Sequence, residues 1–258
     1  MLLNYSQKNQ KWQILIFREY NLIINQHKDV FMRKFILVSI ISLPLFADIF
    51  PATIESTIVN IENNKLQLSS PFPADGMSGI VIHTYDQGLR AATTYIMQTS
   101  SNGKSKMLNK PFMESSNLPN IATKVAPGDR VIGGYLYDNV LLIAPDEATY
   151  QNITSKYHKK WIHPDLYATF ISEKRDGEIT KENLASFARA YQVGLVAIVK
   201  KDTLAIYDPV SEKIIAQETL QTPSAAQYPF FTRFQKIKSG WFGLSAKGEY
   251  YNNVEQIR

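Results

Sequence analysis

The residues best suited to chemistry cluster in the sequence HKKWIHPD, residues 158–165. His158 and His163 are five positions apart, whereas two ligands on one helical face are usually four apart. With Asp165 they form a candidate for a weak metal site, and His163 with Asp165 is the candidate pair for a hydrolase. His83 lies in an apolar strand pattern, where we expect a hydrogen-bonded wall residue rather than a catalyst.

Other catalytic signatures are missing from the sequence. There is no Gly-x-Ser-x-Gly nucleophile elbow, and no Ser-x-x-Lys leads into matching partner motifs. Gly133-Gly134 lies in a strand pattern without a following helix, so it does not predict a phosphate-binding loop. Asp176-Gly177-Glu178 resembles only part of a calcium loop. We therefore predict a protein that is not an enzyme and that needs no cofactor or metal.

Cysteine content and charge exclude further classes. The chain has no cysteine, which excludes thiolate catalysis, disulfides and zinc ribbons. Its 258 residues carry a formal charge of +5, but residues 1–47 hold six basic and two acidic side chains. The remaining 22 basic and 21 acidic residues leave a net charge of only +1. A nucleic-acid-binding protein would carry a basic field on its folded part, so we expect no nucleic-acid partner.

The elements around the HKKWIHPD sequence predict an α+β unit. Pro164 is suited to the first turn of a helix and Asp165 to its positive end, so a helix is expected to open at His163-Pro164. Trp161 and Ile162 form an apolar plug before it. Helical spacing covers residues 147–157, 164–172 and 180–191, and strand patterns cover residues 195–199, 203–207 and 213–219. Helices followed by a short antiparallel meander are typical of α+β domains.

The residues before this unit predict strands. Alternating apolar patterns surround turn sequences such as Glu62-Asn63-Asn64-Lys65, which indicates a hairpin. The predicted strands cover residues 53–61, 66–68, 78–85, 89–99, 105–112, 131–137 and 140–144. Short strands at this spacing are typical of a small antiparallel barrel or sandwich. The predicted fold class is therefore α+β, with an N-terminal β-barrel or sandwich.

Residues 32–47 have the order of a secretory signal peptide. Met32-Arg33-Lys34 is followed by an apolar run of twelve residues and by Ala47, a small residue at the expected cleavage site. This run is shorter than the roughly 20 residues that span a bilayer. A buried helix or an uncleaved anchor is the alternative. Because a signal peptide normally begins a protein, we expect translation to start at Met32.

These patterns divide the chain into five expected parts. They are a mis-annotated N-terminal extension, the signal peptide, a β-rich domain, an α+β domain and an aromatic–basic C-terminal segment, at residues 1–31, 32–47, 48–146, 147–222 and 223–258.

Aromatic and basic residues concentrate in the C-terminal segment, between residues 228 and 251. One interpretation is that the rings pack on the second domain; the other is a surface for a partner or the membrane interface. The candidate partner-binding residues are Lys159, Lys160, Trp161, Phe231, Arg233, Lys236, Lys238 and Trp241.

Several motifs in a fixed order give the chain a family resemblance. They are SGIVIH at 78–83, GD at 128–129, GYLY at 134–137, LLIAP at 141–145, WIHPDL at 161–166, YQVGL at 191–195 and QYPFFTRF at 227–234. Their order and spacing resemble the N-terminal domain family of bacterial plasminogen-binding protein A, over nearly the whole chain after the signal peptide.

The resemblance implies an exported envelope or surface protein of a Gram-negative bacterium that captures host plasminogen. In the family this activity is attributed to a lysine-bearing C-terminal extension. The kringle pockets of plasminogen pair the lysine ammonium with acids and hold its stem between aromatic rings. The sequence ends in Gln256-Ile257-Arg258, and arginine does not replace lysine in such a pocket. We therefore expect the fold to transfer and plasminogen binding to be weak, with Lys159-Lys160 and Lys236/Lys238 as contacting side chains.

Two other functions stay open from the sequence. One is a periplasmic assembly or scaffold factor for an envelope apparatus, with envelope proteins as partners. The other is the hydrolase centred on His163 and Asp165. In each case the expected location is the periplasm, the outer membrane or the cell surface. Membrane contact is expected only through the signal segment or the aromatic C-terminal stretch.

Overall fold

A computed structural model describes residues 48–108, 123–174, 177–234, 238–239, 244–245 and 248–258. The strands before the first described helix are β1 (Ile54–Glu62), β2 (Lys65–Leu68), β3 (Ser78–Thr84), β4 (Arg90–Ser100), β5 (Lys104–Leu108), β6 (Arg130–Gly133) and β7 (Asn139–Ile143), with the 3-10 turn η1 (Asp86–Gly88) between β3 and β4. They are followed by α2 (Glu147–Lys156), β8 (Lys160–Ile162), α3 (Pro164–Glu173), α4 (Lys181–Tyr191), β9 (Leu195–Lys200), β10 (Thr203–Asp208), β11 (Lys213–Thr219), β12 (Lys238–Ser239), β13 (Leu244–Ser245) and α5 (Tyr250–Val254).

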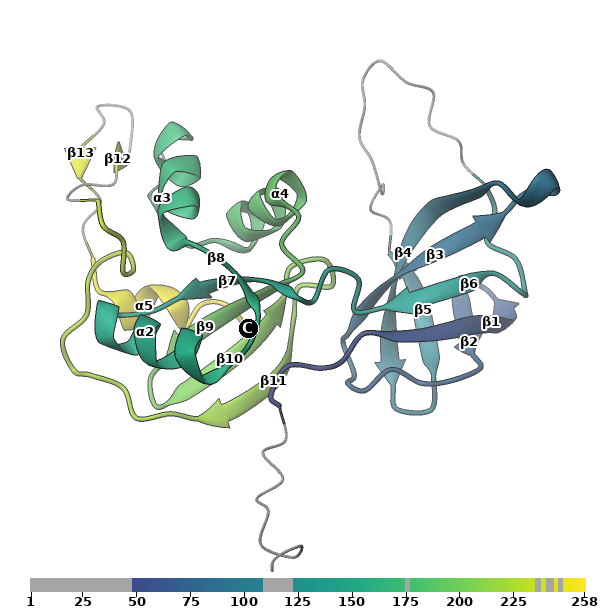
Figure 1. Cartoon of the computed structure of the whole chain (residues 1–258), viewed down its shortest axis with the longest axis horizontal. Helices are drawn as coiled ribbons and strands as arrows, with labels where there is room; N and C mark the ends of the chain where they lie inside the picture. Colours follow the sequence, from purple (N-terminus) through teal and green to yellow (C-terminus); the bar gives the residue numbers. More distant parts are fainter. Residues whose placement is uncertain (1–47, 109–122, 175–176, 235–237, 240–243, 246–247) are drawn as a thin grey trace, which may run out of the picture. The chain divides into compact units, whose positions relative to one another are not determined.

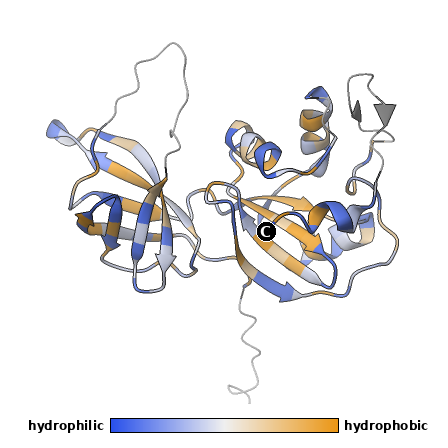
Figure 2. Ribbon diagram, turned by 180° about the vertical axis from the view of Figure 1, so that it is seen from behind, coloured by the Kyte–Doolittle hydropathy of each residue, from blue (hydrophilic) through white to orange (hydrophobic). Residues whose placement is uncertain are grey.

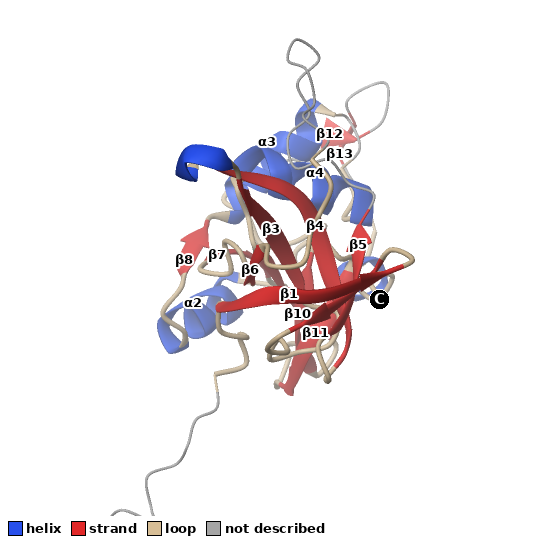
Figure 3. Ribbon diagram, turned by 90° about the vertical axis from the view of Figure 1, so that its right-hand side faces the viewer, coloured by secondary structure: helices blue, strands red, loops and turns tan. Residues whose placement is uncertain are grey.

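The first six strands form a closed antiparallel barrel in the order β1-β2-β5-β4-β3-β6 (Figures 1 and 3). Its β1–β2 hairpin turns at Asn63 and Asn64, whose φ angles of 47° and 67° are the left-handed values that a two-residue hairpin turn requires. Inward-facing residues such as Ile58, Leu66 and Val131 fill the barrel. The predicted hairpin is therefore confirmed, and of the two predicted architectures, a barrel or a sandwich, the structure has the barrel.

The second sheet has the strand order β11-β10-β9-β7-β8. Strands β9, β10 and β11 form the predicted antiparallel meander, and β7 pairs in parallel with both β8 and β9. All six residues of β9 are buried, because the sheet is covered on both faces. Figure 2 shows this sheet as largely hydrophobic along its central strands.

Each face of the second sheet belongs to a different hydrophobic core. Leu141 and Ile143 of β7 pack with residues of α3, α4 and α5. The alternate residues Val140 and Leu142 pack with Ile153 of α2 and join the core that fills the barrel. This alternation is the period-2 pattern of a strand that is buried on both sides.

Local signals set the helix boundaries as predicted. Asp146 accepts a hydrogen bond from the Thr149 N–H at 2.7 Å and caps α2, and the Thr180 hydroxyl accepts one from the Asn183 N–H at 3.1 Å and caps α4. Pro164 begins α3. Among the described residues, no helix has the length and apolar character needed to cross a bilayer.

Several elements differ from the expectation. Strand β7, which we grouped with the first domain, joins the second sheet, because its apolar run suits an interior parallel strand. Residues Lys160–Ile162, expected as a plug before a helix, form strand β8, and the short helix α5 was not foreseen. The domain boundaries themselves stay a prediction, as does the signal peptide, since residues 1–47 lie outside the described part of the chain.

Gly194 lies between α4 and β9 and packs closely against the link between the barrel and the second sheet. A Cβ atom at this position would lie 2.1 Å from the Leu136 carbonyl oxygen, so Gly194→Ala must displace backbone. We expect a loss of unfolding free energy of about 1–3 kcal/mol or more in urea denaturation. The control is Gly88→Ala, where a Cβ meets nothing within 4 Å and only the positive φ costs about 1 kcal/mol. Equal losses in both variants would contradict this explanation.

Candidate functional site

Three of the predicted partner-binding residues, Lys159, Lys160 and Trp161, come shortly before α3, and of these only Lys160 is exposed to solvent. The Lys159 side chain is 11% exposed; its ammonium lies 5.1 Å from the centre of the Phe50 ring and 3.7 Å from the Asp138 carboxylate. Trp161 is half-buried and donates its indole N–H to the Tyr157 carbonyl at 3.1 Å. Lys160 itself is exposed. The contacts of Lys159 and Trp161 therefore stabilise the packing of the chain around strand β8.

The predicted residues Phe231 and Arg233 are held at the start of α3 by Asp165. This carboxylate accepts hydrogen bonds from the Thr232 hydroxyl at 2.7 Å, the Arg233 N–H at 3.0 Å and the Arg233 Nε at 2.6 Å. Phe231 is 8% exposed and packs on Tyr150, whereas the Arg233 side chain is 70% exposed. Arg233 therefore combines a structural bond with an accessible guanidinium.

The other predicted residues cannot be placed. Lys238 is described only as part of the backbone of β12, and Lys236 and Trp241 lie outside the described residues. Of the aromatic stretch 228–251, Phe230 and Tyr250 are buried, and the Tyr250 hydroxyl donates to a sheet carbonyl, that of Val199 at 2.6 Å. These two rings pack on the second domain, as one interpretation of the stretch expected. The partner-binding set as a whole stays a prediction.

Next to Arg233 the surface carries exposed apolar groups. Phe234 is 45% exposed and Leu166, on the first turn of α3, is 46% exposed. Both flank the bond between Asp165 and Arg233 along the chain. Arginine and aromatic side chains beside apolar groups are typical of the energetically important part of protein interfaces. We call Leu166, Arg233 and Phe234 the α3 surface.

Electrostatics at the start of α3 favours a structural role for its titratable groups. Burial raises the pKa of Asp165, but the hydrogen bonds from Thr232 and Arg233 outweigh it, so this pKa lies below its ordinary value. Burial lowers the pKa of His163 despite the neighbouring Asp165 carboxylate. The neutral His163 Nδ1 accepts the Asp165 N–H at 3.2 Å and caps α3. This geometry gives no support to the hydrolase hypothesis.

His83 is also engaged. Its Nδ1 lies 2.7 Å from the Asp129 carboxylate, which in turn accepts the Ala126 N–H at 2.8 Å. The expectation of a hydrogen-bonded wall residue is confirmed. Within the described ranges, no three His, Asp or Glu side chains gather in a way that could hold a metal ion.

A buried carboxylate joins the barrel to the second sheet. Asp208, at the end of β10, is fully buried and accepts hydrogen bonds from four donors of the described chain. One oxygen receives the Ser78 N–H at 2.7 Å and the Tyr137 hydroxyl at 2.6 Å. The other receives the N–H groups of Val210 and Ser211. Burial, with the Asp208 charge, raises the pKa of Tyr137 well above its usual value.

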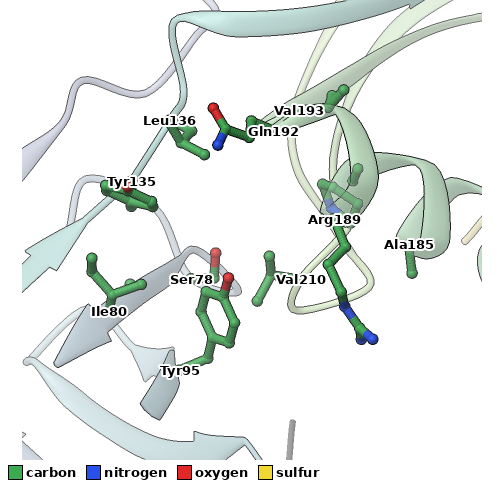
Figure 4. Close-up of a pocket in the computed structure, with 14 residues that line it drawn as sticks. Ser78, Ile80, Tyr95, Tyr135, Leu136, Ala185, Arg189, Gln192, Val193 and Val210 are labelled. Atoms are coloured by element: carbon green, nitrogen blue, oxygen red, sulfur yellow. The ribbon is translucent and has the colours of Figure 1, made fainter. Parts of the chain in front are cut away.

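Beside this carboxylate lies a cavity of about 410 Å³. Figure 4 shows Ser78, Tyr95 and Tyr135 on one side of it and Arg189 and Gln192, from the end of α4, on the other. Burial raises the pKa of Tyr95, and the Arg189 charge partly opposes this rise. The volume and mixed lining are typical of a small-ligand pocket. Sequence reasoning missed the cavity, because its walls come from distant segments without a shared motif.

Comparisons with known proteins agree with the fold and the motif order. The family model described as plasminogen-binding protein pgbA N-terminal matches residues 53–256. The plasminogen-binding protein PgbA of Helicobacter pylori strain J99 is 26% identical over 223 residues, which are 84% of this chain and 49% of the relative. That of strain 26695 is 29% identical over 144 residues, 55% of this chain and 31% of the relative.

The chain thus spans about half the length, or less, of the curated relatives that it matches. No solved structure matches the chain. The relatives are named as binding proteins, which gives no support to the hydrolase or to the scaffold factor.

Tyr137→Phe tests the buried carboxylate. The change removes one hydrogen bond to a buried charge, so we expect a loss of about 1.5–3 kcal/mol of unfolding free energy in urea denaturation. Tyr207→Phe is the matched control: Tyr207 is also fully buried, and in the described part of the chain its hydroxyl has no hydrogen-bond partner. The control is expected to lose no stability, because removing its hydroxyl breaks no hydrogen bond. A control loss as large as that of Tyr137→Phe would show that Asp208 is not the cause.

The lowered pKa of His163 is expected to make the stability of the protein depend on pH. Because its folded pKa lies below the ordinary value of about 6.5, the unfolded chain binds a proton first as the pH falls. The contribution of His163 is therefore complete above that value and is lost as the pH falls through the folded pKa. Asparagine keeps a cap acceptor but does not titrate. We expect His163→Asn to match the wild type near pH 7.5 and to show a flatter loss of melting temperature down to pH 5. An unchanged pH profile would refute this assignment.

Proposed function

Because the chain belongs to the family of plasminogen-binding protein pgbA N-terminal regions, we propose that it is a non-enzymatic binding module whose partner is a protein, with plasminogen as the first candidate. The observation that carries the proposal is the extent of the family match, from residue 53 to residue 256. This range includes every strand of the barrel and of the second sheet.

The chemistry of the described residues supports a binding role. His83, His163, Asp165 and Asp208 are each engaged in bonds that hold elements of the fold together. These groups are committed to structure, so the surface residues are the ones that remain for contact with a partner. Lys160 and the α3 surface are accessible and offer a cation beside apolar groups.

We further propose that the protein is exported and acts in the bacterial envelope or at the cell surface. The relatives' printed names refer to plasminogen, which is an extracellular protein. The order of charge and hydrophobicity in residues 32–47 is the sequence feature that supports export.

The test is binding of the purified chain, residues 48–258, to immobilised plasminogen by surface plasmon resonance. We expect a dissociation constant on the order of 10 µM, because individual exposed charge pairs contribute little free energy. The lysine analogue ε-aminocaproate should abolish the binding by occupying the lysine pockets of plasminogen. Serum albumin on the reference surface is the control.

Two results would contradict the proposal. Absence of any signal when the chain is injected at about 100 µM over immobilised plasminogen would remove plasminogen as the partner. Tight binding that ε-aminocaproate leaves unchanged would show that lysine side chains do not carry the interaction.

A further inference from the structure

Three exposed lysines lie together on the outer face of the barrel. Lys65 of β2 is directly opposite Lys106 of β5, and Lys104 is two residues from Lys106 on the same strand. Their neighbours Leu66 and Ser105 are buried, so the lysine side chains alternate outwards. We call Lys65, Lys104 and Lys106 the lysine cluster.

The charges of this cluster are not neutralised within the described chain. Lys156, Lys159 and Lys200 each lie within 4.0 Å of a carboxylate, at distances of 3.0, 3.7 and 3.7 Å. None of the three cluster ammoniums has such a partner among the residues that the structure describes.

The strands next to the cluster supply little negative charge. Glu62 of β1 is opposite Lys65 and is the one acidic side chain directly opposite a member of the cluster in these pairings. On the other side, β4 places Met97 opposite Lys106 and Ser100 opposite Lys104. The three lysines therefore form a local positive patch, because few of the residues opposite them are acidic.

A purely protective role does not explain the cluster. Lysines often guard the free edge of a sheet against pairing with other chains. Here β2 pairs with β1 and β5, and β5 pairs with β2 and β4, so neither strand has a free edge. Like charges directly opposite each other destabilise a sheet. The placement costs stability without protecting an edge, and a negatively charged partner would reverse that cost.

We propose that the lysine cluster is a docking surface for an acidic patch on a protein partner. The inference rests on the proposed function, because it assumes that the partner is a protein recognised through lysine ammoniums. The sheet fixes the three Cα positions, with neighbouring strands about 4.8 Å apart, so the cations form a stiff platform. An acidic pocket such as a lysine-binding site fits this arrangement by charge complementarity.

A membrane surface fits this patch less well. Peripheral attachment combines basic side chains with apolar groups that enter the lipid interface. Among the described residues, the exposed large hydrophobic side chains lie at Val59, Leu89, Tyr135, Leu166, Tyr191 and Phe234, and none belongs to β2 or β5. An acidic protein surface requires no such insertion.

The test compares two triple variants that lose the same charge. The first is Lys65→Gln with Lys104→Gln and Lys106→Gln. The matched control replaces Lys174, Lys201 and Lys213 by glutamine, three exposed lysines outside the barrel that are not among the proposed contact residues. Both are measured against immobilised plasminogen at 50 and 150 mM salt. We expect about tenfold weaker binding for the cluster variant and less than about twofold for the control, with a shallower salt dependence only in the cluster variant.

Melting temperatures separate folding from binding. The cluster variant should melt no lower than the wild type, because the repulsion between Lys65 and Lys106 is removed. Equal losses of binding in both variants would overturn the inference, since total charge would then be responsible. Unchanged binding of the cluster variant would also overturn it while leaving the proposed function intact.

Failure of the proposed function gives a different result. If the wild type does not bind plasminogen, an immobilised hexaglutamate peptide becomes the probe. Retention of the wild type and of the control, but not of the cluster variant, would support an acidic-protein surface for another partner. Absence of wild-type retention, or equal retention of all three proteins, would overturn the inference.

Discussion

The structure depends on the satisfaction of one buried negative charge. Moving a carboxylate out of water costs several kcal/mol unless donors in the protein replace the lost hydration. Asp208 meets this requirement with donors from three places: the start of β3, the link after β6 and the turn after β10. Each donor group must be in position at the same time. The barrel and the second sheet are therefore held in one arrangement at this point, and a single hydrophobic core contains residues of both.

Hydrogen bonds to buried carboxylates also fix other parts of the molecule. Ser78 and Val210 line the cavity beside Asp208 and also donate to its carboxylate, so this part of the cavity wall is fixed by the same contacts (Figure 4). Asp165 acts in a similar way at the other side of the second sheet, where it fixes Thr232 and Arg233. Both carboxylates use most of their acceptor capacity in these bonds. Polar groups inside the protein thus hold elements in place, and interaction with a partner is left to the surface.

The parts of the fold that the sequence predicts correctly are those with local signals. The caps at Asp146 and Thr180, the proline at the start of α3 and the asparagines of the first hairpin each act within a few residues. The alternation of apolar residues in the first half was sufficient to predict antiparallel strands in a barrel or a sandwich, but not to choose between the two. A family resemblance based on motif order pointed to the same fold.

Features that depend on distant residues could not be predicted in this way. Strand β8 is defined by its parallel pairing with β7, in which Trp161 lies opposite Val140. Its three residues are too few to form a pattern from which a strand could be predicted. Asp208 looks like a turn residue before Pro209, and its sequence gives no sign that Ser78, 130 residues away, donates to it. Phe231 and Arg233 have similar surroundings in the sequence. The difference appears only in the structure, where the Phe231 ring packs on Tyr150 and Arg233 bonds to Asp165 with its side chain largely exposed.

The division between a fixed interior and a charged exterior also favours a particular kind of binding. A closed barrel has no edge strand that could pair with another chain, so a partner that docks on the barrel must recognise side chains. Lysine ammoniums on long stems give up conformational entropy when they are bound, and salt screens their attraction. Contacts of this type are individually weak. Strong attachment then requires several of them together, or a further segment that brings the same partner close.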